Sequence, residues 1–363
     1  MRIGFDAKWF FEGPPSGRRI VRGLVEGLTK FIDGDELHLF LDARFECESS
    51  SVGIPRSQQH YVWAQNNQLS NLFAVPRVAD RAGMDVVVYQ NFAAPSLVAR
   101  HARVPLVHDV IFQESPQYYT GLERLYFAPL RALSKRADRV CTVSNSEKAR
   151  MVRLGFAEAE RIDVVPYGID EEFRAHRHVA AAEPTRPFVL FVGRLTVRKN
   201  VSVLIRAMQH VKTVGLDLVV VGASDRTCED LPALAQALGV AHRVRFLGPM
   251  RDELPALYAA AAVFCFPTHD ESFGLPPLEA MASGTPTVVS DIPVLREMYG
   301  DAAVYIDPYD ERALATAIDA VIGNHDRAEA LRAKGRARAA SFTWDRAAVL
   351  LLASARSAVR ERS

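Results

Sequence analysis

The sequence predicts an α/β protein made of two doubly wound domains. Its length of 363 residues corresponds to two domains of about 150 to 200 residues each. Short, continuous apolar runs such as 188–193 and 216–222 recur along the chain, with helical patterns between them. Strands of this kind are buried on both faces, which is typical of a parallel sheet covered by helices. Residues 171–187 lack periodicity and predict a linker between domains 1–170 and 188–341.

The predicted strands indicate that the functional residues lie at one edge of each sheet. Strands of the first domain are expected at 2–7, 36–43, 61–64, 85–92, 105–110, 139–144 and 162–168. Those of the second domain are expected at 188–193, 216–222, 244–248, 262–267, 285–290 and 303–307. Ligands of doubly wound sheets bind outside the carboxyl ends of the strands, and two such sheets that face each other form one deep cleft. We therefore expect the functional residues to follow strand ends.

Composition and charge exclude several classes of protein. With 49% apolar and 24% charged residues, the chain has the composition of an ordinary folded, water-soluble protein. Its 44 basic residues nearly equal its 43 acidic ones, which disfavours nucleic acid as a partner. The four cysteines lack metal-binding spacing, and no apolar run approaches the roughly 18 residues of a membrane span. Charges near the N-terminus also interrupt any apolar signal core, so we predict a cytoplasmic protein.

Two cations follow the first strand of the second domain. Gly193 ends the run 188–193, and Arg194 and Lys199 lie before a helical pattern that begins at Val201. A glycine turn into a helix N-terminus with nearby cations suits a diphosphate without a metal ion. The alternative is that both cations are solvated loop residues. The phosphate-binding loop of nucleotide triphosphatases and the dinucleotide motif of dehydrogenases are both absent.

The segment 269–286 contains the densest chemical signal. Glu271 follows a predicted strand, and Glu279 lies in the next predicted helix, whose first turn suits two prolines. Gly274 allows the backbone to approach a ligand closely. Ionised carboxylates accept paired hydrogen bonds from vicinal diols, so one could hold a ribose and the other a sugar. The alternatives are a helix-dipole partner with a solvated glutamate, or a hydrolytic acid–base pair.

Residues 271–286 resemble the signature of the family 4 retaining glycosyltransferases, which use nucleotide sugars and have the two-domain GT-B fold. Residues 193–200 resemble the phosphate loop of that family, and residues 143–148 resemble its short strand-to-helix turn. Residues 164–170 resemble the strand end before the linker. Residues 342–363 resemble the last helix, which crosses back to the first domain. The resemblance is dense in the C-terminal half and looser in the N-terminal half.

The resemblance implies that the first domain binds the acceptor and the second binds the nucleotide sugar. Arg194 and Lys199 would neutralise the donor diphosphate. Glu279 would hold the ribose and Glu271 the transferred sugar. Arg198 is assigned no contact. The implied donor-binding set is Gly17, Gly193, Arg194, Lys199, Glu271, Phe273, Gly274, Leu275 and Glu279. With His108, the residues Glu271, Arg194 and Lys199 form the implied catalytic set.

Two residues of the first domain complete this set. His108, in the run 105–110, matches the strand-end histidine of the family next to the anomeric carbon of the sugar, although a structural histidine is the alternative. Gly17, predicted in a loop before a helix, lies where the family has a glycine near the phosphates. The sequence departs from the family here, because Gly17 is followed by two arginines instead of further glycines.

A basic segment at 122–153 allows two interpretations. From Arg124 to Arg153 it contains eight cations and two acidic residues, and a helix predicted near 122–139 has one apolar face. A basic amphipathic helix can contact an anionic membrane surface, whereas the alternative is a helix that packs on its own sheet with a solvated basic face. Asp33 and Asp35 match a metal-binding D-x-D pattern, but their sequence is typical of a turn, and we predict no metal site.

These observations predict a metal-independent, retaining hexosyltransferase that needs no cofactor. It would move a hexose from a nucleoside diphosphate sugar to a hydroxyl of a glycan or lipid-linked glycan in bacterial polysaccharide biosynthesis. GDP-mannose is the preferred donor. Two alternatives stay open: a UDP- or dTDP-sugar-dependent transferase of the same fold, and a non-catalytic nucleotide-sugar-binding protein. The predicted location is the cytoplasm, with the segment 122–153 as the candidate for peripheral contact with the inner face of the membrane.

Overall fold

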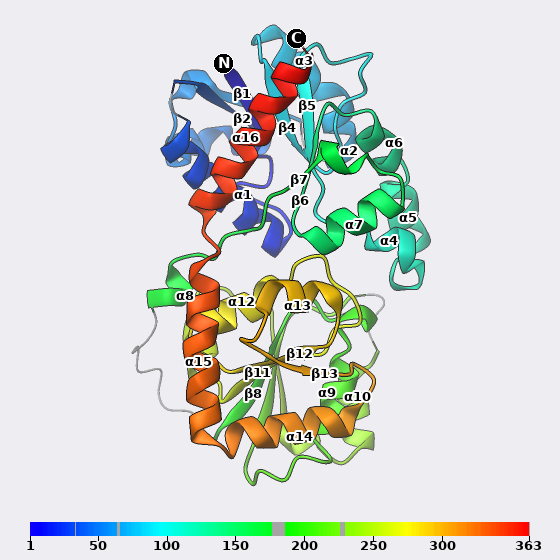
Figure 1. Ribbon diagram of the computed structural model, residues 1–363, viewed down its shortest axis with the longest axis vertical. Helices are drawn as coiled ribbons and strands as arrows, with labels where there is room; N and C mark the ends of the chain where they lie inside the picture. Colours follow the sequence, from blue (N-terminus) through cyan, green and yellow to red (C-terminus); the bar gives the residue numbers. More distant parts are fainter. Residues whose placement is uncertain (33, 64–65, 176–185, 226–228, 363) are drawn as a thin grey trace. The chain divides into compact units, whose positions relative to one another are not determined.

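The computed structural model describes residues 1–32, 34–63, 66–175, 186–225 and 229–362. The chain divides into two compact units, each built around its own sheet (Figure 1). The N-terminal unit contains Met1–Glu114, Gly121–Gly168 and Phe342–Ser363. The C-terminal unit contains Ser115–Thr120 and Ile169–Ser341. Of the predicted linker, residues 176–185 lie outside the described residues, and its first part forms a helical turn, α8 (Glu172–Ala175).

The described residues of the N-terminal unit form a seven-stranded parallel sheet in the order β3-β2-β1-β4-β5-β6-β7. Its strands are β1 (Arg2–Asp6), β2 (Glu36–Asp42), β3 (Gln59–Val62), β4 (Val86–Gln90), β5 (Ala102–Leu106), β6 (Val140–Thr142) and β7 (Ile162–Val164). Each overlaps a predicted run, although β5 begins three residues early. The central strands are almost wholly buried, as continuous apolar runs predict.

The described residues of the C-terminal unit form a six-stranded parallel sheet in the order β10-β9-β8-β11-β12-β13. Its strands are β8 (Phe188–Val192), β9 (Asp217–Val221), β10 (Val244–Gly248), β11 (Val263–Phe266), β12 (Thr287–Ser290) and β13 (Val304–Ile306). All six lie within predicted runs. Successive strands are added on one side of β8 (β9 and β10) and then on its other side (β11 to β13). The carboxyl ends of β8 and β11 therefore border the switch point where ligands of such sheets bind.

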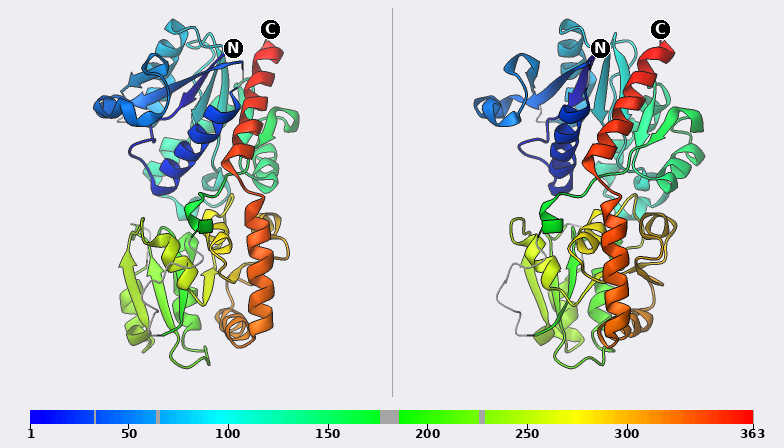
Figure 2. Two further views of the ribbon diagram at one scale, coloured as in Figure 1. Left: turned by 90° about the vertical axis from the view of Figure 1, so that its left-hand side faces the viewer. Right: turned by 60° about the vertical axis from the view of Figure 1, so that its left-hand side comes forward.

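Helices cover both sheets. Those of the N-terminal unit are α1 (Pro15–Phe31), α2 (Asn67–Leu69), α3 (Val75–Arg81), α4 (Ile111–Glu114), α5 (Gly121–Phe127), α6 (Leu130–Lys135), α7 (Asn145–Arg153) and α16 (Trp344–Arg362). Those of the C-terminal unit, besides α8, are α9 (Val201–Ala207), α10 (Leu231–Ala237), α11 (Leu254–Ala260), α12 (Leu275–Ala282), α13 (Pro293–Tyr299), α14 (Glu311–Ile322) and α15 (His325–Ala340). In this unit α12 packs on α15, and α9 packs on α14 (Figure 2).

The last helix, α16, packs closely on α1 and on strands β4 and β5 of the N-terminal unit (Figures 1 and 2). Glycines on α1 make this approach possible. An added Cβ at Gly23 would collide with the Trp344 ring, and one at Gly27 would lie 2.6 Å from the Trp344 carbonyl oxygen. Small residues at such a contact let two helix backbones come close together. The C-terminal segment is therefore part of the core of the N-terminal unit.

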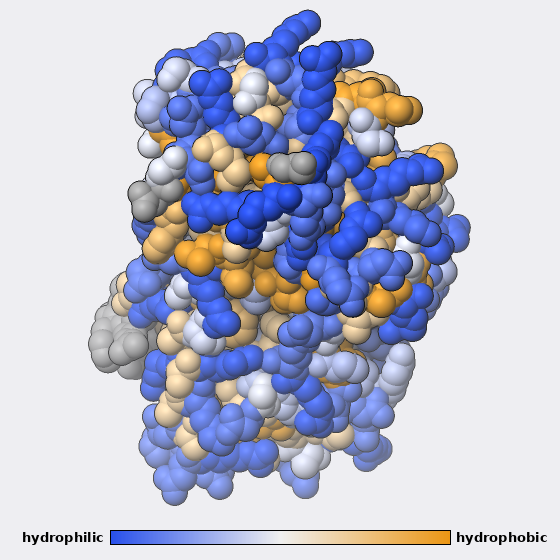
Figure 3. All heavy atoms as spheres, turned by 45° about the horizontal axis from the view of Figure 1, so that its top comes forward, coloured by the Kyte–Doolittle hydropathy of each residue, from blue (hydrophilic) through white to orange (hydrophobic). Residues whose placement is uncertain are grey.

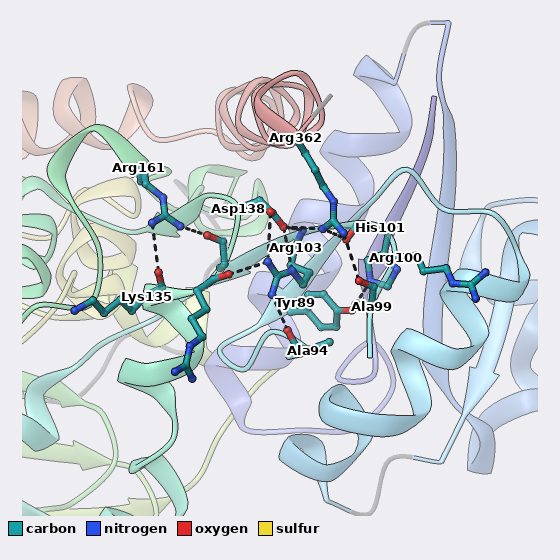
Figure 4. Close-up of polar contacts among 12 residues, drawn as sticks. Tyr89, Ala94, Ala99, Arg100, His101, Arg103, Lys135, Asp138, Arg161 and Arg362 are labelled. Carbon is teal, nitrogen blue, oxygen red and sulfur yellow. Dashed lines mark hydrogen bonds and ion pairs between the residues drawn. The ribbon is translucent and has the colours of Figure 1, made fainter. Parts of the chain in front are cut away.

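Arg103 explains why β5 begins before the predicted run. Its side chain is buried, and its guanidinium donates to Asp138 Oδ2 at 3.0 Å and to the Arg136 carbonyl oxygen at 2.8 Å. Asp138 also accepts a hydrogen bond of 3.3 Å from Arg362 at the end of α16 (Figure 4). A charged residue that would mark a strand boundary in the sequence is thus paired inside the unit, where an unpaired charge would be costly.

The helix predicted near 122–139 is instead two short helices, α5 and α6, because Pro129 cannot continue the first one. Its apolar face is not continuous: Leu130 is fully buried, whereas Leu122 and Leu125 are 76% and 71% exposed. Hydrophilic side chains predominate on the face of the molecule that Figure 3 shows. Among the described residues, no helix combines the length and the apolar character needed to cross a membrane.

Candidate functional site

The loop after β8 begins the candidate site of the C-terminal unit. A 3-10 turn at Val197–Lys199 leads into α9, which begins at Val201 as predicted. Asn200 closes the turn with a φ of 55°, in the left-handed region that non-glycine residues rarely adopt. Its side-chain amide donates to the carbonyl oxygens of Pro267 at 3.0 Å and Pro308 at 2.7 Å. These bonds fix the turn beside the carboxyl end of β11.

Glu271 follows β11 and meets the cations of that turn. Its buried carboxylate oxygen Oε1 lies 3.1 Å from Arg198 Nη1 and is paired with Lys199 Nζ. The Thr268 hydroxyl lies 3.3 Å from the same oxygen. Burial by itself would raise the pKa of Glu271, but Lys199 and Arg198 outweigh burial and hold this pKa below its ordinary value. Glu271 is therefore an ionised carboxylate next to two cations.

Arg198, which was assigned no contact with the donor, makes several contacts within the protein. Besides its ion pair with Glu271, its guanidinium donates to the Asp270 carbonyl oxygen at 2.5 Å. The carbonyl oxygen of Arg198 in turn accepts hydrogen bonds from the His269 N–H at 2.8 Å and from the Thr268 hydroxyl at 3.0 Å. Arg198 thus joins the two loops of the site.

Arg194 and Gly193 lie at the end of β8 but do not contact Glu271. The Arg194 guanidinium is 65% exposed and pairs with Asp225 at 2.6 Å. The Gly193 N–H donates to the Val221 carbonyl oxygen of β9 at 3.0 Å, so it continues the sheet. The structure therefore brings Lys199 to Glu271, and it places Arg194 at an exposed position nearby in sequence.

Gly274 adopts a backbone conformation that only glycine readily accepts. Its φ is 90°, and it precedes α12 as the helix cap. The Tyr299 hydroxyl donates to the Gly274 carbonyl oxygen at 2.7 Å, and an added Cβ at Gly274 would collide with this hydroxyl. Of the neighbouring residues in the predicted site, Phe273 precedes Gly274 and is buried, and Leu275 follows it as the first residue of α12.

Glu279 lies one turn into α12 and is almost fully buried, with 2% exposure. The hydroxyl of Tyr258 on α11 donates to Glu279 Oε2 at 3.0 Å. Both prolines at the start of α12 occupy the first turn, as the sequence predicted. Tyr258 and Tyr299 were not identified from the sequence, because nothing in the spacing of an aromatic residue on another helix shows that its hydroxyl reaches this loop.

In the N-terminal unit, His108 follows β5 and makes hydrogen bonds with both of its ring nitrogens. Nε2 lies 2.9 Å from Gln90 Oε1, and Nδ1 lies 2.5 Å from the Tyr167 hydroxyl. The Gln90 amide nitrogen already donates to the Asp6 carbonyl oxygen, so Gln90 Oε1 accepts from Nε2–H and Nδ1 accepts from Tyr167. Burial lowers the pKa of His108 to about 4. The imidazole is therefore neutral.

We expect acid to destabilise the protein partly through His108. The unfolded chain takes up a proton near pH 6.5, whereas the native imidazole does so only near pH 4. Stability present above pH 6.5 is therefore lost as the pH falls, by about 2 kcal/mol between pH 7 and pH 5. Denaturant titrations of wild type and His108→Gln at both pH values measure this, with the exposed His325→Gln as control. An equal loss in all three proteins would contradict the assignment.

Gly17 lies inside the first turns of α1 and not in a loop, which corrects the prediction. It is buried against Trp9: an added Cβ would lie 2.9 Å from Trp9 Cε3. Close packing of this ring is thus a structural reason for a glycine at this position. Lys8, which precedes Trp9, is a second buried group that the sequence did not reveal: its ammonium lies 2.6 Å from Asp6 Oδ1 and 2.5 Å from Asn71 Oδ1.

Glu147 holds the loop that carries His108. It lies in the first turn of α7 and is fully buried. Its carboxylate accepts hydrogen bonds of 2.6 Å from the Val110 N–H and 2.6 Å from Arg150 Nη1. Arg150 pairs in turn with Glu114 at 2.8 Å, so part of the charge in the basic segment is neutralised within the unit. The turn at 143–148 therefore positions the neighbouring strand end.

Two family models match this chain. Residues 18–168 match the model described as "Glycosyl transferase 4-like domain", and residues 172–338 match "Glycosyl transferases group 1". The O-antigen chain mannosyltransferase B of Escherichia coli is 30% identical over 268 residues, which cover 70% of each chain. The chain belongs to the group 1 glycosyltransferases. Another relative of this group 1 glycosyltransferase is the D-inositol 3-phosphate glycosyltransferase of Xylanimonas cellulosilytica, 34% identical over 233 residues.

That match covers 60% of this group 1 glycosyltransferase and 56% of the relative, so the chain spans little more than half the length of the first such relatives.

Solved structures show the same fold. Sucrose-phosphate synthase from Thermosynechococcus elongatus has a TM-score of 0.75 at 21% identity, with 97% and 98% of the two chains covered. Anabaena HepE, solved with UDP-glucose, has a TM-score of 0.74 at 20% identity and the same coverage. Two Rossmann-like domains, each with its own parallel sheet, are characteristic of the GT-B fold.

Proposed function

We propose that this group 1 glycosyltransferase moves a hexose from a nucleoside diphosphate sugar to a hydroxyl of a glycan or lipid-linked glycan, with retention at the anomeric carbon and without a metal ion. The C-terminal unit would bind the donor and the N-terminal unit the acceptor. The single observation that carries the proposal is the ionised Glu271 carboxylate paired with Lys199 and Arg198, in a segment whose next helix, α12, carries a second buried acid, Glu279.

Each part of that arrangement suits one part of a nucleotide sugar. A carboxylate accepts hydrogen bonds from the hydroxyls of a sugar, so Glu271 would hold the hexose and Glu279 the ribose. Lys199 and Arg198 would meet the diphosphate, which is a stronger anionic partner than one carboxylate. Arg194, at its exposed position, would reach the diphosphate in competition with Asp225. Backbone groups near Phe273, Gly274 and Leu275 would line the sugar and phosphate.

The proposed reaction breaks the bond between the anomeric carbon and the diphosphate oxygen. Both electrons of that bond leave with the diphosphate, where the cations stabilise the growing negative charge. The acceptor oxygen attacks on the same face, and its proton passes to an oxygen of the leaving phosphate. Neutral His108, with both ring nitrogens engaged, would border the sugar as a positioning group and would not act as the base.

The identity of the donor is the finer part of the proposal. The mannosyltransferase relative favours mannose, and GDP-mannose is our first choice. The UDP-glucose complex of the Anabaena protein favours a UDP-sugar as the second, and a dTDP-sugar is the third. A non-catalytic nucleotide-sugar-binding protein would bind one of these donors without turnover. Bacterial polysaccharide biosynthesis is the process that the named E. coli relative suggests.

The test is a panel of GDP-, UDP- and dTDP-hexoses, incubated with the full chain and glycan acceptors in the presence of EDTA. We expect release of one nucleoside diphosphate and a new α-glycosidic product when the donor is an α-linked sugar nucleotide, as judged by NMR. Activity that requires added Mn²⁺ would refute metal independence, and inversion at the anomeric carbon would refute the stereochemistry. Binding without turnover across the panel would favour the non-catalytic alternative.

We expect Arg198→Ala and Lys199→Ala each to lower kcat by about 10-fold to 100-fold, with a smaller effect on donor affinity. The reason is that the negative charge on the departing diphosphate grows in the transition state. Arg206→Ala is the control, because Arg206 is exposed and lies farther along α9. Steady-state kinetics at saturating donor decide the outcome. Wild-type kcat in Arg198→Ala and Lys199→Ala would show that these cations only pair with Glu271.

A further inference from the structure

A hollow in the N-terminal unit lies beside the ends of two neighbouring strands. It has a volume of about 190 Å³ and is lined by Lys8, Trp9, Glu12, Gly13, Asp42 and Arg44. Asp42 ends β2, and Lys8 lies two residues after the end of β1. These strands pair in parallel, so their carboxyl ends meet at the edge of the sheet where ligands of such folds bind. None of the proposed donor-binding residues lines this hollow.

Trp9 forms one wall of the hollow, and glycines in the neighbouring backbone leave room for its ring. An added Cβ would lie 2.8 Å from Trp9 Cγ at Gly13 and 2.9 Å from Trp9 Cε3 at Gly17. The indole ring therefore rests directly on the backbone of the loop and of α1. Its centroid lies 6.0 Å from that of the His108 ring, and the side chain remains partly exposed. Trp9 thus lies between the hollow and His108, the residue assigned to the reaction centre.

The polar walls carry paired charges. The Arg44 guanidinium donates to Asp42 Oδ2 from Nε at 2.9 Å and from Nη2 at 2.6 Å, and its Nη1 lies 3.0 Å from Glu12 Oε2. Asp42 is buried, whereas Glu12 is 60% exposed. The other cation of the lining, Lys8, is held by Asp6 at 2.6 Å. Two cations therefore face three carboxylates.

This chemistry selects one class of ligand. A partly exposed indole ring offers an apolar face to the C–H face of a sugar ring, and carboxylates accept paired hydrogen bonds from vicinal hydroxyls. A phosphate group would meet like charges on Glu12 and Asp42, while Arg44 is already shared between those two carboxylates. The walls therefore suit an uncharged polyhydroxyl ring better than a phosphorylated one.

We propose that this hollow is the acceptor subsite for an uncharged hexopyranose residue of a glycan, that Trp9 stacks on its ring, and that Glu12 and Asp42 discriminate against phosphorylated acceptors. The inference rests on the proposed glycosyltransferase function, because it assigns the acceptor of that reaction. It also gives the glycines at positions 13 and 17 a common role, which is to seat the Trp9 ring.

The experiment compares two probes, methyl α-D-mannopyranoside and inositol 3-phosphate, by saturation-transfer NMR with the full-length chain. We expect the wild type to bind the neutral glycoside more tightly than the phosphate. Trp9→Ala should abolish the glycoside signal, whereas Trp63→Ala should keep it, because Trp63 is a 48% exposed aromatic residue outside the hollow. Tighter wild-type binding of inositol 3-phosphate, or an unchanged signal in Trp9→Ala, would overturn the proposal.

A second variant decides the charge argument without risk to the fold. Glu12 is exposed, and Glu12→Gln removes one carboxylate while keeping its shape. The preference for the glycoside over inositol 3-phosphate should fall by about fivefold to tenfold, as expected for the loss of one repulsive charge pair. An unchanged preference would contradict the assigned role of Glu12. Failure of the proposed glycosyltransferase function can be distinguished from failure of this acceptor subsite. In the first case the glycoside would still bind, but no nucleotide sugar in the panel would be turned over.

Discussion

Glu271→Gln is expected to lower kcat for sugar transfer by at least about 100-fold, which corresponds to about 2.7 kcal/mol. Glutamine keeps the shape of the side chain but removes the charge that Lys199 and Arg198 neutralise. Hydrogen bonds to charged groups contribute about 1.5 to 3 kcal/mol each, and the loss leaves two poorly exposed cations without their shared carboxylate. Steady-state kinetics at saturating donor measure the effect.

Glu253→Gln is the matched control for that variant, because Glu253 is an exposed acid of the same unit. Its kcat should equal the wild-type value. Because Lys199 and Arg198 hold the pKa of Glu271 below its ordinary value, we expect this group to stay ionised, and to support transfer, at a lower pH than an ordinary glutamate would. A Glu271→Gln variant with wild-type turnover would remove Glu271 from the sugar site.

Gly274→Ala is expected to have the second largest effect, a loss of about 100-fold in kcat together with weaker donor binding. The Cβ would meet the Tyr299 hydroxyl at a φ of 90°, so the loop before α12 must shift. That shift moves Phe273 and the first turn of the helix that carries Glu279. Kinetics and donor titrations on the same preparation measure both effects.

Gly239→Ala is the control that separates the effect of the collision with Tyr299 from the effect of backbone strain at a positive φ. Gly239 also has a positive φ, of 71°, but an added Cβ there has nothing within 4 Å. We expect lower stability and unchanged activity in this variant. A double variant, Gly274→Ala with Tyr299→Phe, should recover part of the lost activity because the colliding hydroxyl is gone. Equal activity losses in Gly274→Ala and Gly239→Ala would show that the contact with Tyr299 is not the cause.

The sheets could be predicted because their signal is local. Buried parallel strands appear in the sequence as continuous apolar runs, such as β8 and β9, and these coincide with predicted runs. β5 was displaced because Arg103 lies inside it, and the partner that makes this burial tolerable, Asp138, lies 35 residues later. α5 and α6 resemble one helix in the sequence because apolar residues recur at helical spacing on both sides of Pro129, which separates the two helices in the structure.

The candidate site was predictable only in part. Glu271, Gly274 and Glu279 stand in one short segment, whose order along the chain carries the resemblance. Their partners come from other elements: the hydroxyl of Tyr258 reaches Glu279, and that of Tyr299 reaches Gly274. Such contacts depend on how helices pack, which residue spacing within one segment does not encode.

Charged residues show the same limit. Arg198 and Arg194 look equivalent in the sequence, four residues apart in one loop. The 3-10 turn at Val197–Lys199 aims Arg198 at Glu271, whereas Arg194 precedes the turn and pairs with Asp225. In the N-terminal unit, the role of Gly17 is equally hidden in the sequence, because it depends on where the ring of Trp9, eight residues earlier, packs in the folded chain.

Equilibrium binding of UDP, GDP and dTDP to the full-length chain, by isothermal titration calorimetry in EDTA, tests most directly that the C-terminal unit is a nucleotide-sugar site. We predict that one nucleoside diphosphate binds, that Glu279→Gln and Lys199→Ala each weaken its binding by about tenfold, and that Arg206→Ala leaves it unchanged. If none of the three nucleoside diphosphates bound, or if the wild type, Glu279→Gln and Lys199→Ala bound them with equal affinity, the C-terminal unit would not be the nucleotide-sugar site.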